Sequence, residues 1–369
     1  NNHMLKIVSA WLLFFGILFK YMLSRLGLCR RPRFTDHVAP MRIVTGQLYG
    51  WKRLRVVDAG YCPRENPALF LCNHVRLDDP HMVWPAVYDA SGGRIEIRFM
   101  MRDDFFRGFP WKLLPIRLDE IAEMAGAYRI SRDHIHLSQV KPFLEILETP
   151  GSFLMFPTGT RSRSGLLMEY RPKMEDPGGA SFFIAHAQRR HPERRVAAVP
   201  LCRTYNPVSR QTTVVFGAPA YLQTPADRDA LRRFDHELVA RIGGLLEIQV
   251  AHVVCGMLYL RCLHGLREPV AVAALTAAAR HVFDGLTQRH VEPAARQDLG
   301  RAVWNTVRYL RRRRMLRITG DRIIPDVERI LRTPPLDTRY WKRNPVKYLV
   351  NQVLHLNDLT ALLEEAWRM

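Results

Sequence analysis

Short apolar runs alternate with helical stretches between residues 54 and 222, and this alternation most constrains the fold. The runs typical of buried strands are Leu54–Val57, Ala68–Cys72, Ile95–Met101, Phe153–Phe156, Val196–Leu201 and Thr212–Phe216. Helical spacing occupies the stretches near residues 80–90, 104–115, 136–148 and 178–190. Such alternation favours parallel strands joined by helical crossovers. We therefore predict an α/β domain over residues 40–224, with a mixed, mostly parallel sheet flanked by helices.

The remainder, residues 225–369, predicts a C-terminal helical domain. Helical apolar spacing covers the segments near residues 228–265, 269–289 and 292–314, and a last helix is expected over 345–368. Met315–Ile324 predicts a small hairpin about Gly320 and Asp321. Helices followed by a basic hairpin are also typical of a winged-helix-like module. A basic nucleic-acid-binding protein is therefore an alternative from a different functional class.

Residues 4–28 predict an N-terminal membrane-associated helix. The uncharged stretch Ile7–Phe19 is short for a complete span, so a helix lying in the membrane interface fits equally well. A buried N-terminal helix is the third possibility. Arginines at positions 25, 30, 31 and 33 follow directly. By the positive-inside rule they predict that the rest of the chain lies on the cytoplasmic side, as on a bacterial inner membrane.

The formal net charge of +20 is high for a globular chain. It suits a polyanionic partner, which includes nucleic acid, an anionic membrane surface and phosphorylated substrates. The six cysteines show neither CxxC nor zinc-finger spacing. Cys72 and Cys202 lie in strand-like runs, which indicates ordinary core residues and a reducing compartment.

His74 and Asp79 form the first candidate for chemistry. His74 follows the strand-like run Ala68–Cys72, and Asp79 comes five positions later, directly before Pro80 at an expected helix start. A histidine with a carboxylate on the next turn can act as a general base with an orienting partner. Asp79 could instead serve as the helix N-cap. Asp78 is its rival, because a shift of one residue would exchange the two.

The second candidate is the segment Phe156–Gly165, which follows a strand and carries Arg161 and Arg163. A glycine-flanked turn at a strand end exposes backbone N–H groups, and two neighbouring arginines can grip a phosphate. A basic surface loop is the alternative interpretation. The segment lacks the GxxxxGK[ST] spacing of a Walker loop.

Together these motifs resemble the glycerolipid acyltransferase superfamily, which includes glycerol-3-phosphate acyltransferases and lysophosphatidate acyltransferases. Those families carry His-x4-Asp after a strand and a later Phe-Pro-x-Gly-Thr-Arg-Ser block. Three intervening pieces have similar order and spacing: the Met101–Trp111 segment with its basic-acidic start, Ile116-Arg117, and Val199-Pro200-Leu201. The resemblance covers about residues 54–222.

The resemblance implies a role for each candidate. His74 takes the proton from the acceptor hydroxyl, and Asp79 holds the other ring nitrogen. The substrate-binding residues would be Arg161 and Arg163 for the phosphate, with help from Arg117 and from either Arg132 or Arg102. Thr158 would hydrogen-bond the glycerol or, alternatively, only end the strand. The Gly159 N–H, or a neighbour in that turn, would stabilise the oxyanion. Because the hydroxyl attacks directly, no acyl-enzyme is needed. The resemblance implies no resident cofactor and no metal. His81 and His134 are expected to be structural rather than catalytic.

Thr158 departs from the pattern, since the family usually has Glu at that position. This keeps open an inactive relative that binds lipid. Soluble plastid-type glycerol-3-phosphate acyltransferases are similar in having a small hydroxyl residue there, a Gly-x-Arg-x-Arg pattern matched by Gly159–Arg163, and a basic patch like Ser131–His134. The tail Tyr348–Leu356 resembles the Tyr-Tyr-x-Asn-x-x-x-His helix of bacterial membrane glycerol-3-phosphate acyltransferases.

These likenesses favour glycerol 3-phosphate as the acceptor and acyl-CoA or acyl carrier protein as the donor. Lysophosphatidate or another lysolipid is the alternative acceptor. The expected partners are these substrates and an anionic membrane surface, and nucleic acid is not expected.

Overall fold

The computed structural model describes residues 2–49, 54–64, 67–102, 117–130, 137–149, 151–169, 177, 179–335 and 337–368. The helix expected near residues 104–115 and the segment of Arg132 and His134 lie outside the described residues.

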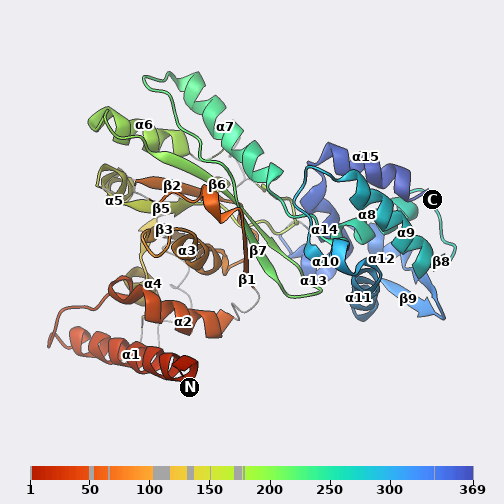
Figure 1. Cartoon of the computed structure of the whole chain (residues 1–369), viewed down its shortest axis with the longest axis horizontal. Coiled ribbons are helices and arrows are strands. Elements are labelled where there is room, and N and C mark those ends of the chain that lie inside the picture. The colour runs from red at the N-terminus through yellow and green to blue at the C-terminus, as the bar shows by residue number, and fades with distance from the viewer. Residues whose placement is uncertain are drawn as a thin grey trace.

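The α/β domain is built on a seven-stranded sheet with the order β1-β7-β6-β2-β5-β3-β4 (Figure 1). The strands are β1 Leu54–Val57, β2 Ala68–Cys72, β3 Ile97–Arg102, β4 Ala127–Ile130, β5 Ser152–Met155, β6 Ala197–Tyr205 and β7 Thr212–Phe216. All neighbours pair in parallel except β6 and β7. The predicted fold class, a mixed and mostly parallel sheet flanked by helices, is therefore confirmed. Strand β4 was missing from the prediction.

The central strand β2 is buried on both faces, which explains its unbroken apolar sequence. Leu69 and Leu71 point into a core shared with the helices α5 (Leu137–Glu148), α6 (Ala180–Arg190) and α7 (Arg228–Gly244). Phe70 and Cys72 point into the opposite core, which is covered by α3 (Asp79–Ala90). This two-sided packing fixes the position of β2, and so fixes where His74 leaves the sheet.

The C-terminal part is a helical bundle with a small sheet of order β8-β10-β9. Its elements are α8 Val250–Leu263, β8 Val270–Ala271, α9 Val272–Gly285, α10 Pro293–Gln297, α11 Leu299–Arg312, β9 Leu316–Thr319, β10 Arg322–Pro325, α12 Val327–Leu331, α13 Tyr340–Arg343, α14 Pro345–Val353 and α15 Asn357–Ala366. The hairpin forms about Gly320 as expected. Strand β8 joins it and gives this domain the topology of a winged-helix module.

Three long helices expected in this domain are each divided in two. Ile248 leaves the helical path because its N–H donates to His290 O and its carbonyl accepts from Glu292, which separates α7 from α8. Asp298 caps α11 through its side chain, and α14 ends at Val353 before Leu356 takes the N-cap position of α15. Helix α7 lies over β6 beside α6, so the predicted boundary at residue 224 precedes a helix that packs on the sheet (Figure 1).

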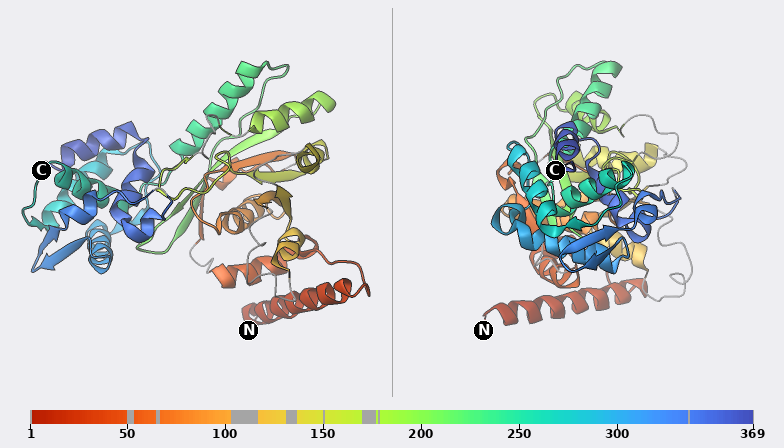
Figure 2. Two further views of the ribbon diagram at one scale, coloured as in Figure 1. Left: turned by 180° about the vertical axis from the view of Figure 1, so that it is seen from behind. Right: turned by 90° about the vertical axis from the view of Figure 1, so that its right-hand side faces the viewer.

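Helix α1 (Asn2–Arg25) lies along the lower edge of the molecule against α2 (Val38–Tyr49) (Figure 2). Its inner side packs Ile17 and Tyr21 into a small core, and the Tyr21 hydroxyl donates to Glu120 at 2.6 Å. Its outer side exposes apolar residues: Met4, Leu5, Val8, Leu12, Phe15, Phe19 and Met22. By length and composition, Met4–Arg25 is apolar enough to cross a membrane, with a mean hydropathy of 1.8.

Candidate active site

His74 and Asp79 meet because the chain turns from the end of β2 into the start of α3 within six residues. The carboxylate Oδ2 of Asp79 lies 2.6 Å from the His74 Nδ1. A carboxylate accepts hydrogen bonds, so the Nδ1 carries the proton and Nε2 is left as the acceptor nitrogen. The His74 side chain is 20% exposed. The pair therefore has the geometry of a base with an orienting partner.

Asp79 organises the loop rather than capping the helix. Its Oδ2 also accepts from the backbone N–H groups of Val75 at 2.7 Å and Arg76 at 2.8 Å. Both donors precede the helix, so the N-cap alternative for Asp79 does not describe its contacts. Asp78 occupies the N-cap position and makes no side-chain cap bond. It accepts from the Arg76 side chain at 3.1 Å and does not contact His74.

A fully buried arginine, Arg203, balances the charge of Asp79. Arg203 on β6 forms an ion pair with Asp79, and a second one with Asp78 at 3.0 Å. Burial alone would raise the pKa of Asp79, but the Arg203 charge and the His74 hydrogen bond outweigh it and hold that pKa below its usual value. Asp79 is therefore ionised at neutral pH although it is inaccessible to water.

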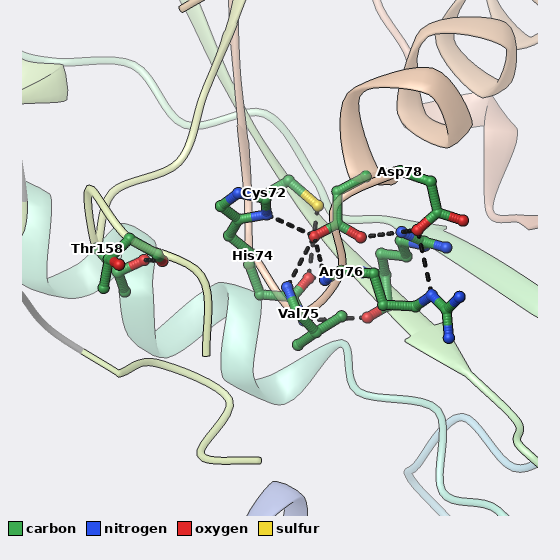
Figure 3. Close-up of polar contacts among 10 residues, drawn as sticks. Cys72, His74, Val75, Arg76, Asp78 and Thr158 are labelled. Carbon is green, nitrogen blue, oxygen red and sulfur yellow. Dashed lines mark hydrogen bonds and ion pairs between the residues drawn. The ribbon is translucent and has the colours of Figure 1, made fainter. Parts of the chain in front are cut away.

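Asn73 locks β2 to β6 just before the histidine. Its side chain donates to the carbonyl oxygen of Arg203 at 3.0 Å and accepts from the Arg203 N–H at 2.7 Å. The His74 ring stacks on Phe156 at a centroid distance of 4.3 Å and an interplanar angle of 21°. Figure 3 shows His74 between Asp78 on one side and Thr158 on the other. These contacts hold the imidazole in one orientation.

The turn that follows β5 carries the other predicted residues. The His74 carbonyl accepts from the Ser162 N–H at 2.7 Å, which joins this turn to His74. Thr158 is buried, and its hydroxyl donates to Thr160 O at 2.9 Å. Gly159 has a φ of +62°, and its N–H donates to Phe156 O at 3.0 Å. Because that N–H is engaged within the turn, the oxyanion role predicted for Gly159 itself is not supported.

Glu169 fixes the conformation of this turn through hydrogen bonds, and the sequence analysis did not predict this role. Its Oε2 accepts from the N–H groups of Arg163 and Ser164, both at 2.9 Å, and from the Ser164 hydroxyl at 2.6 Å. It also accepts from the Ser162 hydroxyl at 3.2 Å. A carboxylate with four donors fixes the backbone path, so the arginines leave the turn in defined directions.

The C-terminal domain holds the same turn from outside. Asn351 on α14 donates to Ser164 O at 3.0 Å, and the Tyr340 N–H donates to Arg163 O at 2.9 Å. Gly165 has a φ of +98°, and a Cβ there would lie 2.2 Å from Tyr348 O. Helix α14 can approach this closely only because residue 165 is glycine. The tail motif predicted from Tyr348 to Leu356 therefore contacts the candidate site directly.

Arginines from both domains gather beside this turn. Arg161 is half-buried, and its pKa is lowered by burial and then by the nearby charges of Arg339 and Arg163. Arg163 is exposed and donates to Asp337 O at 3.4 Å. Cations that depress one another's protonation suit an anionic ligand between them. Arg339 was not predicted, because its contact depends on how the domains pack.

The remaining predicted residues are placed differently. Arg117 begins α4 (Leu118–Met124) and pairs with Glu120 at 3.6 Å, beside Tyr21 of α1. Among the described contacts, none joins Arg117 to His74 or to Arg161. Arg132 lies outside the described residues, as does the side chain of Arg102. In the part of the chain that the structure describes, no group of three or more His, Cys, Asp or Glu side chains is placed to hold a metal ion.

The fold places a histidine paired with a buried carboxylate at the carboxyl end of a central parallel strand. Residues 53–202 match the family model described as Acyltransferase. This segment therefore matches an acyltransferase-family domain, in agreement with the resemblance of its motifs to the glycerolipid acyltransferase superfamily. No curated protein matches the chain.

Among solved structures, the 1-acyl-sn-glycerophosphate (LPA) acyltransferase PlsC from Thermotoga maritima is similar to this chain. The sequence identity is 14%, and the match covers 64% of this chain and 93% of that chain with a TM-score of 0.36. A likeness at that TM-score does not bear on the choice of acceptor.

Proposed function

We propose that this acyltransferase moves a fatty acyl group from acyl-CoA or acyl carrier protein to a hydroxyl of glycerol 3-phosphate. The observation that carries the proposal is His74, whose ring is fixed at Nδ1 by a buried, charge-compensated Asp79 and whose backbone carbonyl is bonded to the turn that presents Arg161. A base beside a cation cluster suits an acceptor with both a hydroxyl and a phosphate.

In the proposed reaction, His74 Nε2 takes the proton from the acceptor hydroxyl as its oxygen attacks the thioester carbonyl. The new C–O bond forms, the C–S bond breaks, and the imidazolium returns its proton to the departing thiolate. Asp79 stabilises the imidazolium and stays ionised, because Arg203 holds its pKa low against the effect of burial. No acyl-enzyme intermediate is required.

The acceptor phosphate would bind to Arg161 and Arg163, with Arg339 from the C-terminal domain as an additional ligand. Lysophosphatidate carries the same phosphate, so lysolipid acylation is the second candidate function. The tail helix α14 favours glycerol 3-phosphate, since it is locked onto the arginine turn through Asn351 and Gly165. The buried Thr158 hydroxyl is already bonded to Thr160 O, so a contact from it to glycerol would require that bond to open.

We further propose that α1 holds the enzyme on the cytoplasmic face of a membrane. Its outer side is apolar, while its inner side is bonded to the domain through Tyr21 and Glu120. A helix fixed along its length to a globular domain fits an interfacial position better than a span.

The test is an assay of the purified chain with labelled acyl-CoA and either glycerol 3-phosphate, lysophosphatidate or unphosphorylated glycerol. We expect the highest kcat/KM with glycerol 3-phosphate. His74→Ala should lower kcat about 1,000-fold, within the range expected for loss of a general base. His281→Ala, which removes an exposed histidine far along the chain, should leave it unchanged. Wild-type activity in His74→Ala, or no transfer to any acceptor, would refute the proposal.

A further inference from the structure

Helix α11 has an outward face made almost entirely of arginine. Its buried side places Val303, Val307 and Leu310 against the bundle. The opposite side carries the exposed residues Arg301, Asn305, Arg308 and Arg312. Their spacing of four, three and four residues puts them on one stripe of the helix, and Arg311 lies beside it.

This stripe is an uncompensated positive surface. Between Leu299 and Gly320 the chain has seven arginines and no acidic residue. The four exposed arginines of α11 form no ion pair within the described chain; these residues are Arg301, Arg308, Arg311 and Arg312. Like charges at neighbouring helical positions oppose folding. Their accumulation on one face therefore indicates an anionic partner that binds there.

Aromatic residues accompany these cations. The Arg308 guanidinium lies 5.5 Å from the Trp304 ring centroid. Next to the end of α11, Arg313 donates to Trp341 O at 2.7 Å, and Lys342 lies 5.4 Å from the partly exposed Trp341 ring. Tryptophan beside Lys and Arg is typical of side chains at a membrane interface, where the ring sits at headgroup level.

The position of α11 decides which anionic partner fits. In Figure 1, α11 lies in the lower part of the C-terminal domain, and α1 forms the lower edge of the molecule. In Figure 2, α1 and α11 again lie on the lower side of the molecule, whereas α7 lies on the upper side. A nucleic acid on α11 would share this side with the exposed apolar residues of α1. A bilayer satisfies both surfaces, since α1 inserts and the arginines meet lipid phosphates.

We propose that the outward face of α11, with Trp341 and Lys342, is a second membrane-attachment surface that binds anionic lipid headgroups. The winged-helix topology of this domain then serves to present α11 to the bilayer. Because α1 and α11 belong to one folded chain, their contributions multiply in the partition coefficient. This inference does not depend on the acceptor of the enzyme.

The experiment compares the full chain with Arg308→Gln/Arg312→Gln and with Arg308→Glu/Arg312→Glu in vesicle flotation. The vesicles contain phosphatidylcholine alone or with about 30% phosphatidylglycerol, the anionic lipid that the proposal requires. The matched controls are Arg228→Gln/Arg233→Gln and Arg228→Glu/Arg233→Glu on α7, where both arginines are exposed. Each Glu pair changes the net charge by four from +20, so the overall charge effect is equal.

We expect the α11 Gln pair to weaken partition onto anionic vesicles about 25-fold, since each arginine near such a surface contributes about five-fold. The Glu pair should weaken it further, and neither should change binding to phosphatidylcholine. The α7 control variants should weaken partition onto anionic vesicles by about three-fold at most, which is the effect expected from the change in net charge alone. Equal losses for the two helices would overturn the proposal. Loss of duplex DNA binding in the α11 variants with unchanged vesicle binding would assign the face to nucleic acid instead. Unchanged far-UV circular dichroism confirms that the variants fold.

Discussion

Substitution of Arg203 tests whether its charge compensation of Asp79 is needed for His74 to act as a base. Replacing Arg203 with Met keeps an apolar stem of similar length in a fully buried position and removes the guanidinium. Asp79 would keep its hydrogen bonds from His74, Val75 and Arg76 but lose its counter-charge. The variant therefore isolates the charge from the local hydrogen bonds.

The expected loss of stability follows from these contacts. Breaking a buried ion pair by removing one partner costs about 3–5 kcal/mol. Two considerations place Arg203→Met near the lower end. Asp79 retains its hydrogen bonds, and the Nε and Nη2 atoms of Arg203 have no hydrogen-bond partner in the described chain, so their burial no longer has to be offset. We expect a decrease of about 3 kcal/mol in the free energy of unfolding at pH 7.

The pH dependence of the free energy of unfolding is a second, independent test. In the wild type, the pKa of Asp79 is below its usual value, so the ionised carboxylate stabilises the fold above about pH 4 and this contribution is lost at lower pH. Without Arg203, burial raises that pKa, and the folded variant binds a proton more readily than the unfolded chain. The stability deficit of Arg203→Met should therefore shrink as the pH falls from 7 to about 5.

The assay is urea denaturation followed by circular dichroism, together with kcat for acyl transfer. Arg55→Met is the matched control, because it breaks the ion pair between Arg55 and the buried Glu247, near β1 at the sheet edge. Both variants should be destabilised, but only Arg203→Met should lower kcat, by about 100-fold, since an Asp79 without its counter-charge binds a proton more readily and then stabilises the imidazolium less. A double-mutant cycle with Asp79→Asn should show coupling of about 2–3 kcal/mol. Coupling below about 0.5 kcal/mol, or equal kcat in the two Met variants, would refute the reasoning.

Two further predictions concern the C-terminal domain. Gly165→Ala places a Cβ 2.2 Å from Tyr348 O and should raise KM for the phosphorylated acceptor at least about ten-fold in steady-state kinetics. Gly27→Ala is the control, because Gly27 also has a positive φ but lies in open space, and this variant should leave KM unchanged. The pKa of the buried His252 is lowered to about 4, mainly by burial. The unfolded chain gains this proton near pH 6.5, so the free energy of unfolding should fall by roughly 3 kcal/mol between pH 6.5 and 4, and urea titrations of His252→Gln should lack that component.

The parts of the site that sequence could predict are the local ones. His74 and Asp79 are separated by a short turn between two strongly patterned elements, so their meeting follows from the end of β2 and the start of α3. Arg203 is 124 residues away from Asp79, and the contact requires β2 to pair with β6. The signal for it was present, because Arg203 continues an apolar strand, where a charge needs a buried partner.

The errors in the fold have equally physical causes. Strand β4 has four residues, one of them Arg129, and it lies at the sheet edge with one hydrogen-bonded neighbour, so its apolar pattern is weak. The division between α7 and α8 falls at Leu245–Gln249, a stretch whose apolar residues continue the helical spacing. Ile248 leaves the helix because it bridges to Val291, which sequence spacing does not reveal.

The candidate site belongs to both domains, although the acyltransferase motifs all lie in one. The turn carrying Arg161 and Arg163 has few backbone bonds of its own. Glu169 satisfies its N–H groups from within, and Asn351 and Tyr340 bond its carbonyls from the C-terminal domain. A turn that depends on α14 and α13 for its shape cannot present its arginines correctly without them. The C-terminal domain is therefore a structural component of the proposed phosphate site, and the tail segment and the arginine turn form one structural unit.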